Sequence, residues 1–187
     1  YLDAMANVNY GATGFSIRYE FGIFRQKIID GWQMEFPDDW LSLGDVWLQP
    51  RKEDAVEITF GGKVRHFLQN DRFCSEVIDG ERVLAVPYDM YIPGYQTGSV
   101  NTLTLWSATS LDGFDMAAFS RGDYLQALEK NTQAEVISKV LYPADDHMNG
   151  KRLRLRQQYL LVSASVQSIL NGHFRQYGTV HNLPQKA

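Results

Sequence analysis

The chain has 187 residues, of which 44% are hydrophobic and 13% aromatic, which is enough for one folded domain with a sizeable core. Its net charge is −4 and its acidic and basic residues are interspersed, so no basic face for nucleic acid is expected. Apolar runs are far shorter than the roughly 20 residues of a membrane span, and Cys74 is the only cysteine, which excludes an intrachain disulfide. We therefore expect a cytoplasmic protein from a reducing compartment, with neither nucleic acid nor membrane as a partner.

The first stretch of the chain predicts a helix end, a strand and a loop. Residues 1–8 have the pattern of the last turns of a helix, with Gly11 as its left-handed C-cap. Residues 15–24 are aromatic and β-prone, which predicts a buried strand. Residues 31–47 are rich in Trp and acids and are broken by Pro and Gly, so we interpret them as an ordered aromatic loop.

A hairpin and two further strands are predicted next. Residues 55–60 and 63–69 flank Gly61-Gly62, the kind of pair that a two-residue primed turn requires. Further strands are expected at residues 82–88 and 100–108. The first half is therefore strand-rich.

The second half predicts helices. Residues 120–123 and 132–135 both have a capping-box pattern, which divides this segment into two helices, the second stopped by Pro143. From Lys151 onward, apolar residues recur every three to four positions, as in an amphipathic helix. These apolar residues are Leu155, Tyr159, Val162, Val166, Ile169 and Phe174. The sequence as a whole predicts a single domain of the α/β (or α+β) class, strand-rich over residues 12–108 and helical over residues 119–178.

The break between the helices, residues 141–150, carries the main chemical candidates. Asp145, Asp146 and His147 lie on a loop bounded by Pro143 and Gly150, and loops held by a rigid scaffold often carry binding groups. Taken alone, these residues leave two interpretations open: the acids act on a ligand, or they cap the following helix near its positive end. No ligand-spaced His or Cys lies near His147, so no metal site is expected.

A series of collinear segments resembles one family, the α-glucan phosphorylases, which act on glycogen, starch or maltodextrin. The segments are 16–26 (SIRYEFGIFRQ), 31–33 (GWQ), 37–41 (PDDWL), 87–89 (PYD), 93–95 (PGY), 100–102 (VNT), 105–108 (LWSA), 122–124 (GDY), 140–143 (VLYP) and 150–159 (GKRLRLRQQY). The resemblance implies a two-lobe, Rossmann-like glycosyltransferase fold. Within that fold this chain is an internal part of the N-terminal lobe of a longer parent protein.

The resemblance also implies a reaction. In this family inorganic phosphate cleaves the terminal α-1,4-glucosyl unit of a glucan and releases glucose 1-phosphate. Pyridoxal phosphate is bound by a lysine of the C-terminal lobe, outside this segment, so no cofactor is expected on the chain itself. We therefore expect the isolated chain to be inactive; the alternative is a non-catalytic dimerisation or glycan-interaction module.

The resemblance assigns roles to the residues of the break. Asp145, Asp146 and His147 correspond to a mobile gate loop over the catalytic cleft, and Tyr142 and Arg154 lie on the side of the acceptor glucan. Family members usually carry Asn at the position of Asp146, and a carboxylate cannot donate a hydrogen bond as an amide does. Packing at a helix end remains the alternative for Tyr142.

Two further implications concern regulation and assembly. The helix from Tyr124 corresponds to the contact between subunits in the family homodimer. Asn171 and Gly172 stand where animal enzymes carry an arginine pair that binds an activating nucleotide. Two neutral residues cannot hold a phosphate in that way, so nucleotide activation is not expected there.

Overall fold

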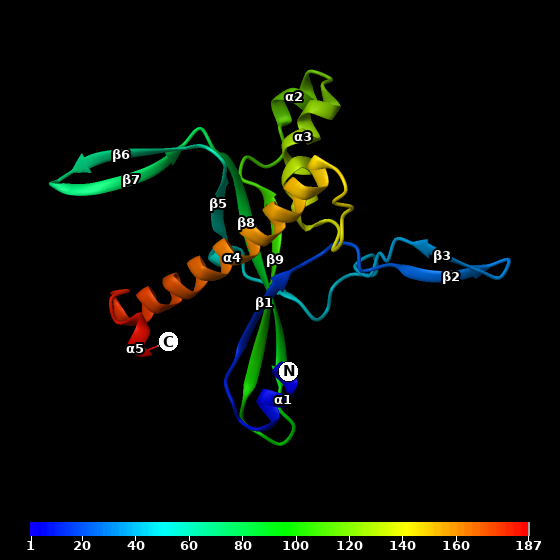
Figure 1. Ribbon diagram of the computed structural model, residues 1–187, viewed down its shortest axis with the longest axis horizontal. Helices are drawn as coiled ribbons and strands as arrows, with labels where there is room; N and C mark the ends of the chain where they lie inside the picture. The colour runs from blue at the N-terminus through cyan, green and yellow to red at the C-terminus, as the bar shows by residue number, and fades with distance from the viewer. Residues whose placement is uncertain (187) are drawn as a thin grey trace.

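The computed structural model describes residues 1–186 as a central sheet crossed by one long helix, with two hairpins that project to opposite sides (Figure 1). The helices are α1 (Leu2–Asn7), α2 (Met116–Ser120), α3 (Tyr124–Glu135), α4 (Met148–Tyr177) and α5 (Leu183–Lys186), with 3₁₀ turns η1 (Lys52–Asp54) and η2 (Val136–Ser138). The strands are β1 (Thr13–Ile17), β2 (Arg25–Ile29), β3 (Trp32–Phe36), β4 (Gln49–Pro50), β5 (Val56–Phe60), β6 (Lys63–Gln69), β7 (Arg72–Ile78), β8 (Glu81–Pro93) and β9 (Val100–Ser110).

The central sheet is built on the long antiparallel pair β8 and β9. Its order is β1-β9-β8-β4, with β5 also paired to β8; β1 runs parallel to β9, whereas β4 and β5 run antiparallel to β8. Strands occupy the first half of the chain and helices the second, so the predicted mixed α/β class is confirmed.

The core lies between one face of this sheet and α4. Because side chains alternate along a strand, Val83 of β8 and Trp106 of β9 point to the same side, where they meet Leu160 and Ala164 of α4. The indole Nε1 of Trp106 donates a hydrogen bond to Ser165 Oγ at 3.1 Å, which satisfies the one polar atom of that buried ring. The helix is thereby fixed across the sheet.

The hairpin predicted around Gly61-Gly62 is wrong. β5 pairs with β8, and β6 pairs with β7 through a turn at Asn70-Asp71, where both residues have positive φ. Phe60 pairs with Glu81 and Lys63 with Ile78, so the two ladders follow one register on either side of an interruption. Gly61-Gly62 therefore interrupts one long two-stranded arm instead of reversing the chain.

Only the start of the predicted strand 15–24 is confirmed, and a second hairpin occupies the start of the predicted aromatic loop, residues 31–47. β1 ends at Ile17, and β2 and β3 form an antiparallel pair around Asp30-Gly31, both with positive φ. Asp-Gly is a strong signal for a two-residue primed turn, and here it outweighs the Trp-rich composition that indicates a loop.

The predicted caps at the start of the helical half are also wrong. Ser120 Oγ donates a hydrogen bond back to the carbonyl of Met116 and does not cap α3, whose N-cap residue, Asp123, makes no side-chain cap bond. The segment 132–135 stays inside α3 or at its end, so it does not start a new helix. At the N-terminus Asn9, not Gly11, takes the left-handed conformation after α1, as asparagine does more readily than most residues.

A charged network ties α4 to the sheet. Arg51 Nε lies 2.7 Å from Asp89 Oδ2 and its Nη1 lies 2.5 Å from Asp54, which also accepts a hydrogen bond from Arg175 of α4 at 2.6 Å. The hydrogen bond from Arg175 lowers the pKa of Asp54; burial opposes this effect and the charge of Arg51 adds to it. Since the folded-state pKa is lowered, the stability that Asp54 contributes is present above its unfolded pKa. It is lost as the pH falls through the lowered value.

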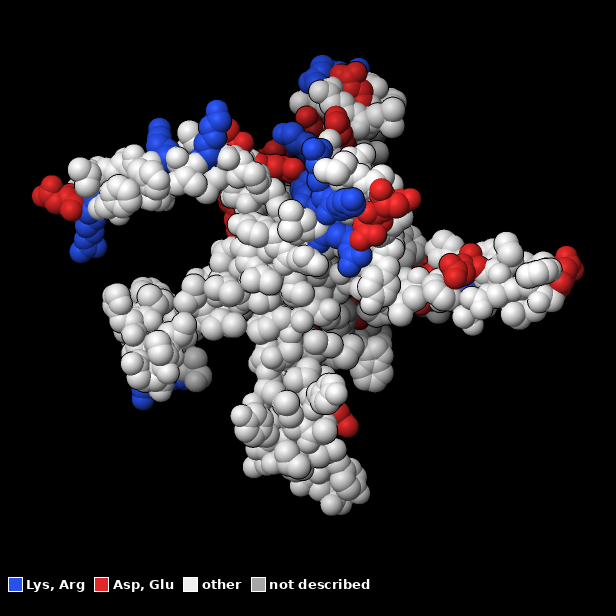
Figure 2. All heavy atoms as spheres, in the orientation of Figure 1, with Lys and Arg blue, Asp and Glu red and all other residues white. Residues whose placement is uncertain are grey.

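The outer face of α4 is apolar and exposed. The residues buried on α4 lie on the side toward the sheet, whereas the predicted apolar stripe lies on the opposite side, where its six members are between 45% and 66% exposed. In Figure 2 the charged side chains gather around the start of α4 and on the projecting elements, while the end of α4 is nearly free of charge. The six predicted residues do share one face of the helix, but the core is formed by the other face.

Candidate gate loop and adjoining hollow

The predicted loop, residues 141–150, covers most of the break between η2 and α4, but its last three residues, 148–150, belong to the first turn of α4. The break is held at its base by α4. Gln157 is buried, and its Nε2 donates hydrogen bonds to the carbonyl oxygens of Ile137 at 3.1 Å and Val140 at 2.9 Å. Both carbonyls belong to the segment that leads into the loop. One amide of α4 therefore satisfies the end of the preceding turn and sets where the loop starts.

The two carboxylates of the loop differ in their contacts. Asp145 Oδ2 accepts a hydrogen bond from Arg154 Nη1 at 2.7 Å, with side-chain exposures of 52% and 44%. The side chain of Asp146 is 87% exposed, and its nearest basic group is His147 at 3.9 Å. The structure therefore brings Asp145 to Arg154 and leaves Asp146 pointing to solvent.

His147 is the N-cap residue of α4. Its Nδ1 accepts a hydrogen bond from the backbone N–H of Gly150 at 3.0 Å, which satisfies one of the unpaired amides of the first turn. The tautomer that makes this bond carries its ring proton on Nε2, because Nδ1 is the acceptor. The helix is capped by this imidazole, where the sequence suggested that the neighbouring acids could do so.

Replacing His147 with alanine should lower the free energy of unfolding by about 0.5–2 kcal/mol, because the amide of Gly150 loses its acceptor. His147→Asn is the matched control, since asparagine is among the best N-cap residues and should recover most of that loss. Urea unfolding measures both. If the two variants unfold at the same urea concentration, the hydrogen bond contributes nothing measurable.

Tyr142 and Arg154, both predicted on the acceptor side, line one small hollow. It has a volume of about 140 Å³ and is also lined by Tyr19, Gln157 and Gln158. Tyr142 is 70% exposed, so it is not packed as a helix end would be. Complete ligand pockets usually enclose about 300–1,000 Å³, so the hollow is the size of part of a binding site.

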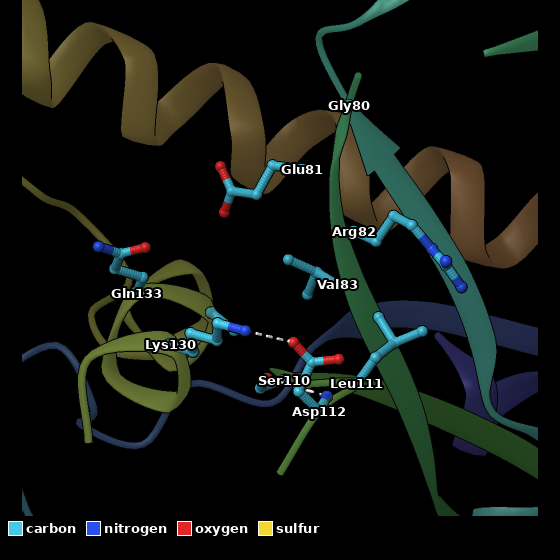
Figure 3. A pocket seen from close by; sticks show the side chains of 10 residues that line it. Gly80, Glu81, Arg82, Val83, Ser110, Leu111, Asp112, Lys130 and Gln133 are labelled. Atoms are coloured by element: carbon cyan, nitrogen blue, oxygen red, sulfur yellow. Dashed lines mark hydrogen bonds and ion pairs between the residues drawn. The ribbon is translucent and has the colours of Figure 1, made fainter. Parts of the chain in front are cut away.

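Another hollow lies between the ends of β8 and β9 and helix α3 (Figure 3). Lys130 Nζ lies 2.7 Å from Asp112 across it, and this hydrogen bond lowers the pKa of Asp112 and raises that of Lys130. Glu81 is paired with Arg156, and Arg82 with Glu57. Because its charges are already neutralised in pairs, this hollow is a weaker candidate for a charged ligand.

A larger hollow, about 770 Å³, lies on the sheet face away from α4. The Arg18 guanidinium stacks 4.4 Å from the centre of the Tyr88 ring and makes an ion pair with Asp45 at 3.2 Å. Lys139 is paired with Glu20 at 2.6 Å. Its main cations are thus engaged in structural contacts.

Metal and membrane signals are absent from residues 1–186. No group of three or more His, Cys, Asp or Glu side chains is placed to hold a metal ion there. Within the same residues no helix combines the length and the apolar character needed to cross a membrane.

Comparison with known proteins decides the family. The pattern of the carbohydrate phosphorylases matches residues 1–187. The chain belongs to the carbohydrate phosphorylase family. It is 46% identical over 170 residues to the liver form of glycogen phosphorylase from Homo sapiens and to the muscle form from Mus musculus. It is 45% identical over the same length to the brain form from Homo sapiens.

These alignments cover 91% of the chain and 20% of each of those glycogen phosphorylases. The chain therefore spans about a fifth of the length of the carbohydrate phosphorylases to which it is similar. Sequence reasoning found Tyr142, Asp145 and Arg154, which the fold brings together, but it missed Tyr19. The segment after β1 that carries Tyr19 reaches the hollow only through tertiary packing, and no local pattern signals it.

Proposed function

We propose that this chain is a segment of a longer α-1,4-glucan phosphorylase. That parent would use inorganic phosphate to remove the terminal glucosyl unit of a glucan as glucose 1-phosphate. The observation that carries the proposal is the 46% identity to glycogen phosphorylases over 91% of the chain. The exposed outer face of α4 supports it too, because an apolar surface of this extent is normally covered in a complete protein.

Within that enzyme, residues 141–150 act as the gate loop. The contact between Asp145 and Arg154 is about half exposed, and such surface ion pairs are worth about 0–1 kcal/mol. A loop held by so weak a contact can leave its place at little cost. A carboxylate and a phosphate dianion also compete for the same basic groups, so withdrawing Asp145 would free Arg154 for an anionic or polar ligand.

Asp146 changes the hydrogen bonds that the gate loop of this chain can make. Where the family usually presents an amide, this side chain is a carboxylate that accepts hydrogen bonds but does not donate them when ionised. The side chain of Asp146 is 87% exposed, so a ligand can reach its carboxylate. A sugar hydroxyl bound at this position would therefore have to act as the donor.

The described residues do not fit pyridoxal phosphate, the cofactor that the family implies. Of the lysines, only Lys139 is partly buried, and its Nζ is engaged with Glu20 at 2.6 Å; the others are exposed. A lysine that forms a Schiff base is instead expected in an enclosed pocket that lowers its pKa. We place the cofactor site of the parent outside this segment.

We propose that α3 forms part of a homodimer contact. The helix projects from the body next to α2 (Figure 1), and its exposed surface includes Leu125, which is 86% exposed. Leu128 and Tyr124 are also exposed, at 48% and 57%, and they lie among polar residues such as Glu129, as in an interface that mixes apolar and polar side chains.

The proposal is tested by assaying both proteins side by side. The full-length parent should release glucose 1-phosphate from maltoheptaose and inorganic phosphate, whereas the isolated 187-residue chain should release none, because it carries only one wall of the cleft. Enzyme-coupled detection of glucose 1-phosphate measures both. Phosphorolysis by the isolated chain would contradict the assignment of catalysis to the missing parts, and an inactive parent with bound cofactor would contradict the function itself.

A further inference from the structure

Tyr19 lies two residues after the end of β1, with its side chain beside the hollow. Its backbone N–H donates to the carbonyl of Ile17 at 3.1 Å, and its own carbonyl accepts a hydrogen bond from Trp40 Nε1 at 3.0 Å. The ring is partly buried against the core. Among residues 1–186 no hydrogen-bond partner occupies its phenol group, although the backbone on which it stands is fixed from two sides.

The surroundings of that phenol include the two groups already assigned to the glucan side. Tyr142 and Arg154 line the same hollow of about 140 Å³ as Tyr19. Burial raises the pKa of Tyr19, Tyr142 raises it further, and Arg154 acts in the opposite direction. The phenol is thus a neutral hydrogen-bond donor at physiological pH, close to both of these side chains.

The two glutamines that line the hollow, Gln157 and Gln158, differ in their hydrogen bonding. Gln157 is buried, and its amide nitrogen donates to the carbonyls of Ile137 and Val140, which hold the base of the gate loop. Gln158, the next residue on α4, is exposed, and its amide is not engaged by another described side chain. One amide therefore serves the structure, and the other is available to a ligand.

We propose that Tyr19 and Gln158 extend the acceptor-glucan subsite of Tyr142 and Arg154, an inference that rests on the proposed phosphorolysis. A sugar ring needs an aromatic face for its apolar side and planar donors and acceptors for its hydroxyls. The hollow supplies two tyrosine rings, one guanidinium and one free amide. Tyr19 contacts the glucan through its hydroxyl, and Gln158 binds a second hydroxyl.

The test uses the full-length parent, with Tyr19→Phe removing only the phenolic oxygen. We expect its KM for maltoheptaose to rise by about 3- to 10-fold, the loss typical of one hydrogen bond, while its KM for phosphate and its kcat stay near wild type. Gln158→Ala should have the same pattern. Tyr91→Phe is the matched control, since Tyr91 lies on β8 and outside the lining of the hollow.

A merely structural role for Tyr19 makes a different prediction. In that case Tyr19→Phe would lower the thermal midpoint or kcat and leave the KM for glucan unchanged, and this result would overturn the inference. If the wild-type parent shows no phosphorolysis, the proposed function fails, and calorimetry with maltoheptaose decides the subsite by itself. Weaker binding of maltoheptaose by Tyr19→Phe than by wild type would still support the subsite. Equal binding by the two proteins, or no binding by wild type, would overturn it.

Discussion

Replacing Gly150 with alanine should displace the gate loop and lower kcat/KM of the parent by about 10- to 100-fold, because small misplacements near a reacting centre are costly. Gly150 is buried in the first turn of α4, directly under the loop. A Cβ built on it collides with the carbonyl oxygen of Ala144 and lies 2.8 Å from its carbonyl carbon and 3.1 Å from Asp145 Cα. All three atoms are backbone, so no side chain can rotate away.

Whether Gly150→Ala stabilises or destabilises depends on two opposing free energies, the cost of the clash and the helix preference for alanine. Alanine inside a helix is favoured over glycine by roughly 0.5–1 kcal/mol, whereas forcing a methyl group into a filled space costs about 1–3 kcal/mol. The loop should move before α4 does, since α4 is packed on the sheet and the contact between Asp145 and Arg154 is weak. The displaced segment includes the carboxylate that we assign to gating.

Gly172→Ala is the matched control on the same helix. Nothing lies within 4 Å of a Cβ built there, so only the helix preference acts, and the variant should be as active as wild type and about 0.5–1 kcal/mol more stable. Phosphorolysis assays and thermal unfolding of both variants provide the comparison. Normal activity in Gly150→Ala would show that the loop does not depend on this close approach.

The sequence indicates the elements of this fold better than their partners. The strand predicted at residues 82–88 and the helix predicted from Lys151 rest on local signals, and both correspond to real elements, β8 and α4. The pairing of β5 is not local: β5 is placed by β8, and Val56 and Ile58 are buried in the core that α4 covers, whereas the Gly61-Gly62 signal favours pairing with β6. Turn residues thus show where a ladder is interrupted, but they do not show whether the chain reverses there.

The same distinction applies to the site. Asp145 and Arg154 lie nine positions apart around a helix start, so their contact was within reach of a local argument, and the resemblance already placed both in one region. Tyr19 follows a strand that is far earlier in the chain, so no local pattern places it at the hollow. The buried amide of Gln157 donates to backbone carbonyls that no motif identifies. The direction of the apolar stripe on α4 was equally beyond reach, because both faces of α4 carry apolar residues and only the sheet selects one.

Replacing Asp89 with alanine should destabilise the parent by about 1–3 kcal/mol, because Thr104 loses its buried acceptor and Arg51 keeps one acid partner, Asp54, in place of two. Asp89 is 5% exposed, and its Oδ1 accepts hydrogen bonds from Thr104 at 2.7 Å and from Arg51 Nη2 at 3.2 Å. Asp89→Asn keeps the size and one acceptor and should lose less.

The control for Asp89 is the exposed acid Asp112, whose pair with Lys130 is screened by water, so Asp112→Ala should leave stability nearly unchanged. Thermal unfolding at neutral pH gives the midpoints of the three variants, and we expect the lowest midpoint for Asp89→Ala. Arg51 would remain half-buried beside Asp54, which already accepts a hydrogen bond from Arg175 of α4. We therefore expect the substitution to weaken the attachment of α4 to the sheet as well. Equal midpoints for Asp89→Ala and Asp112→Ala would mean that the network does not tie α4 to the sheet.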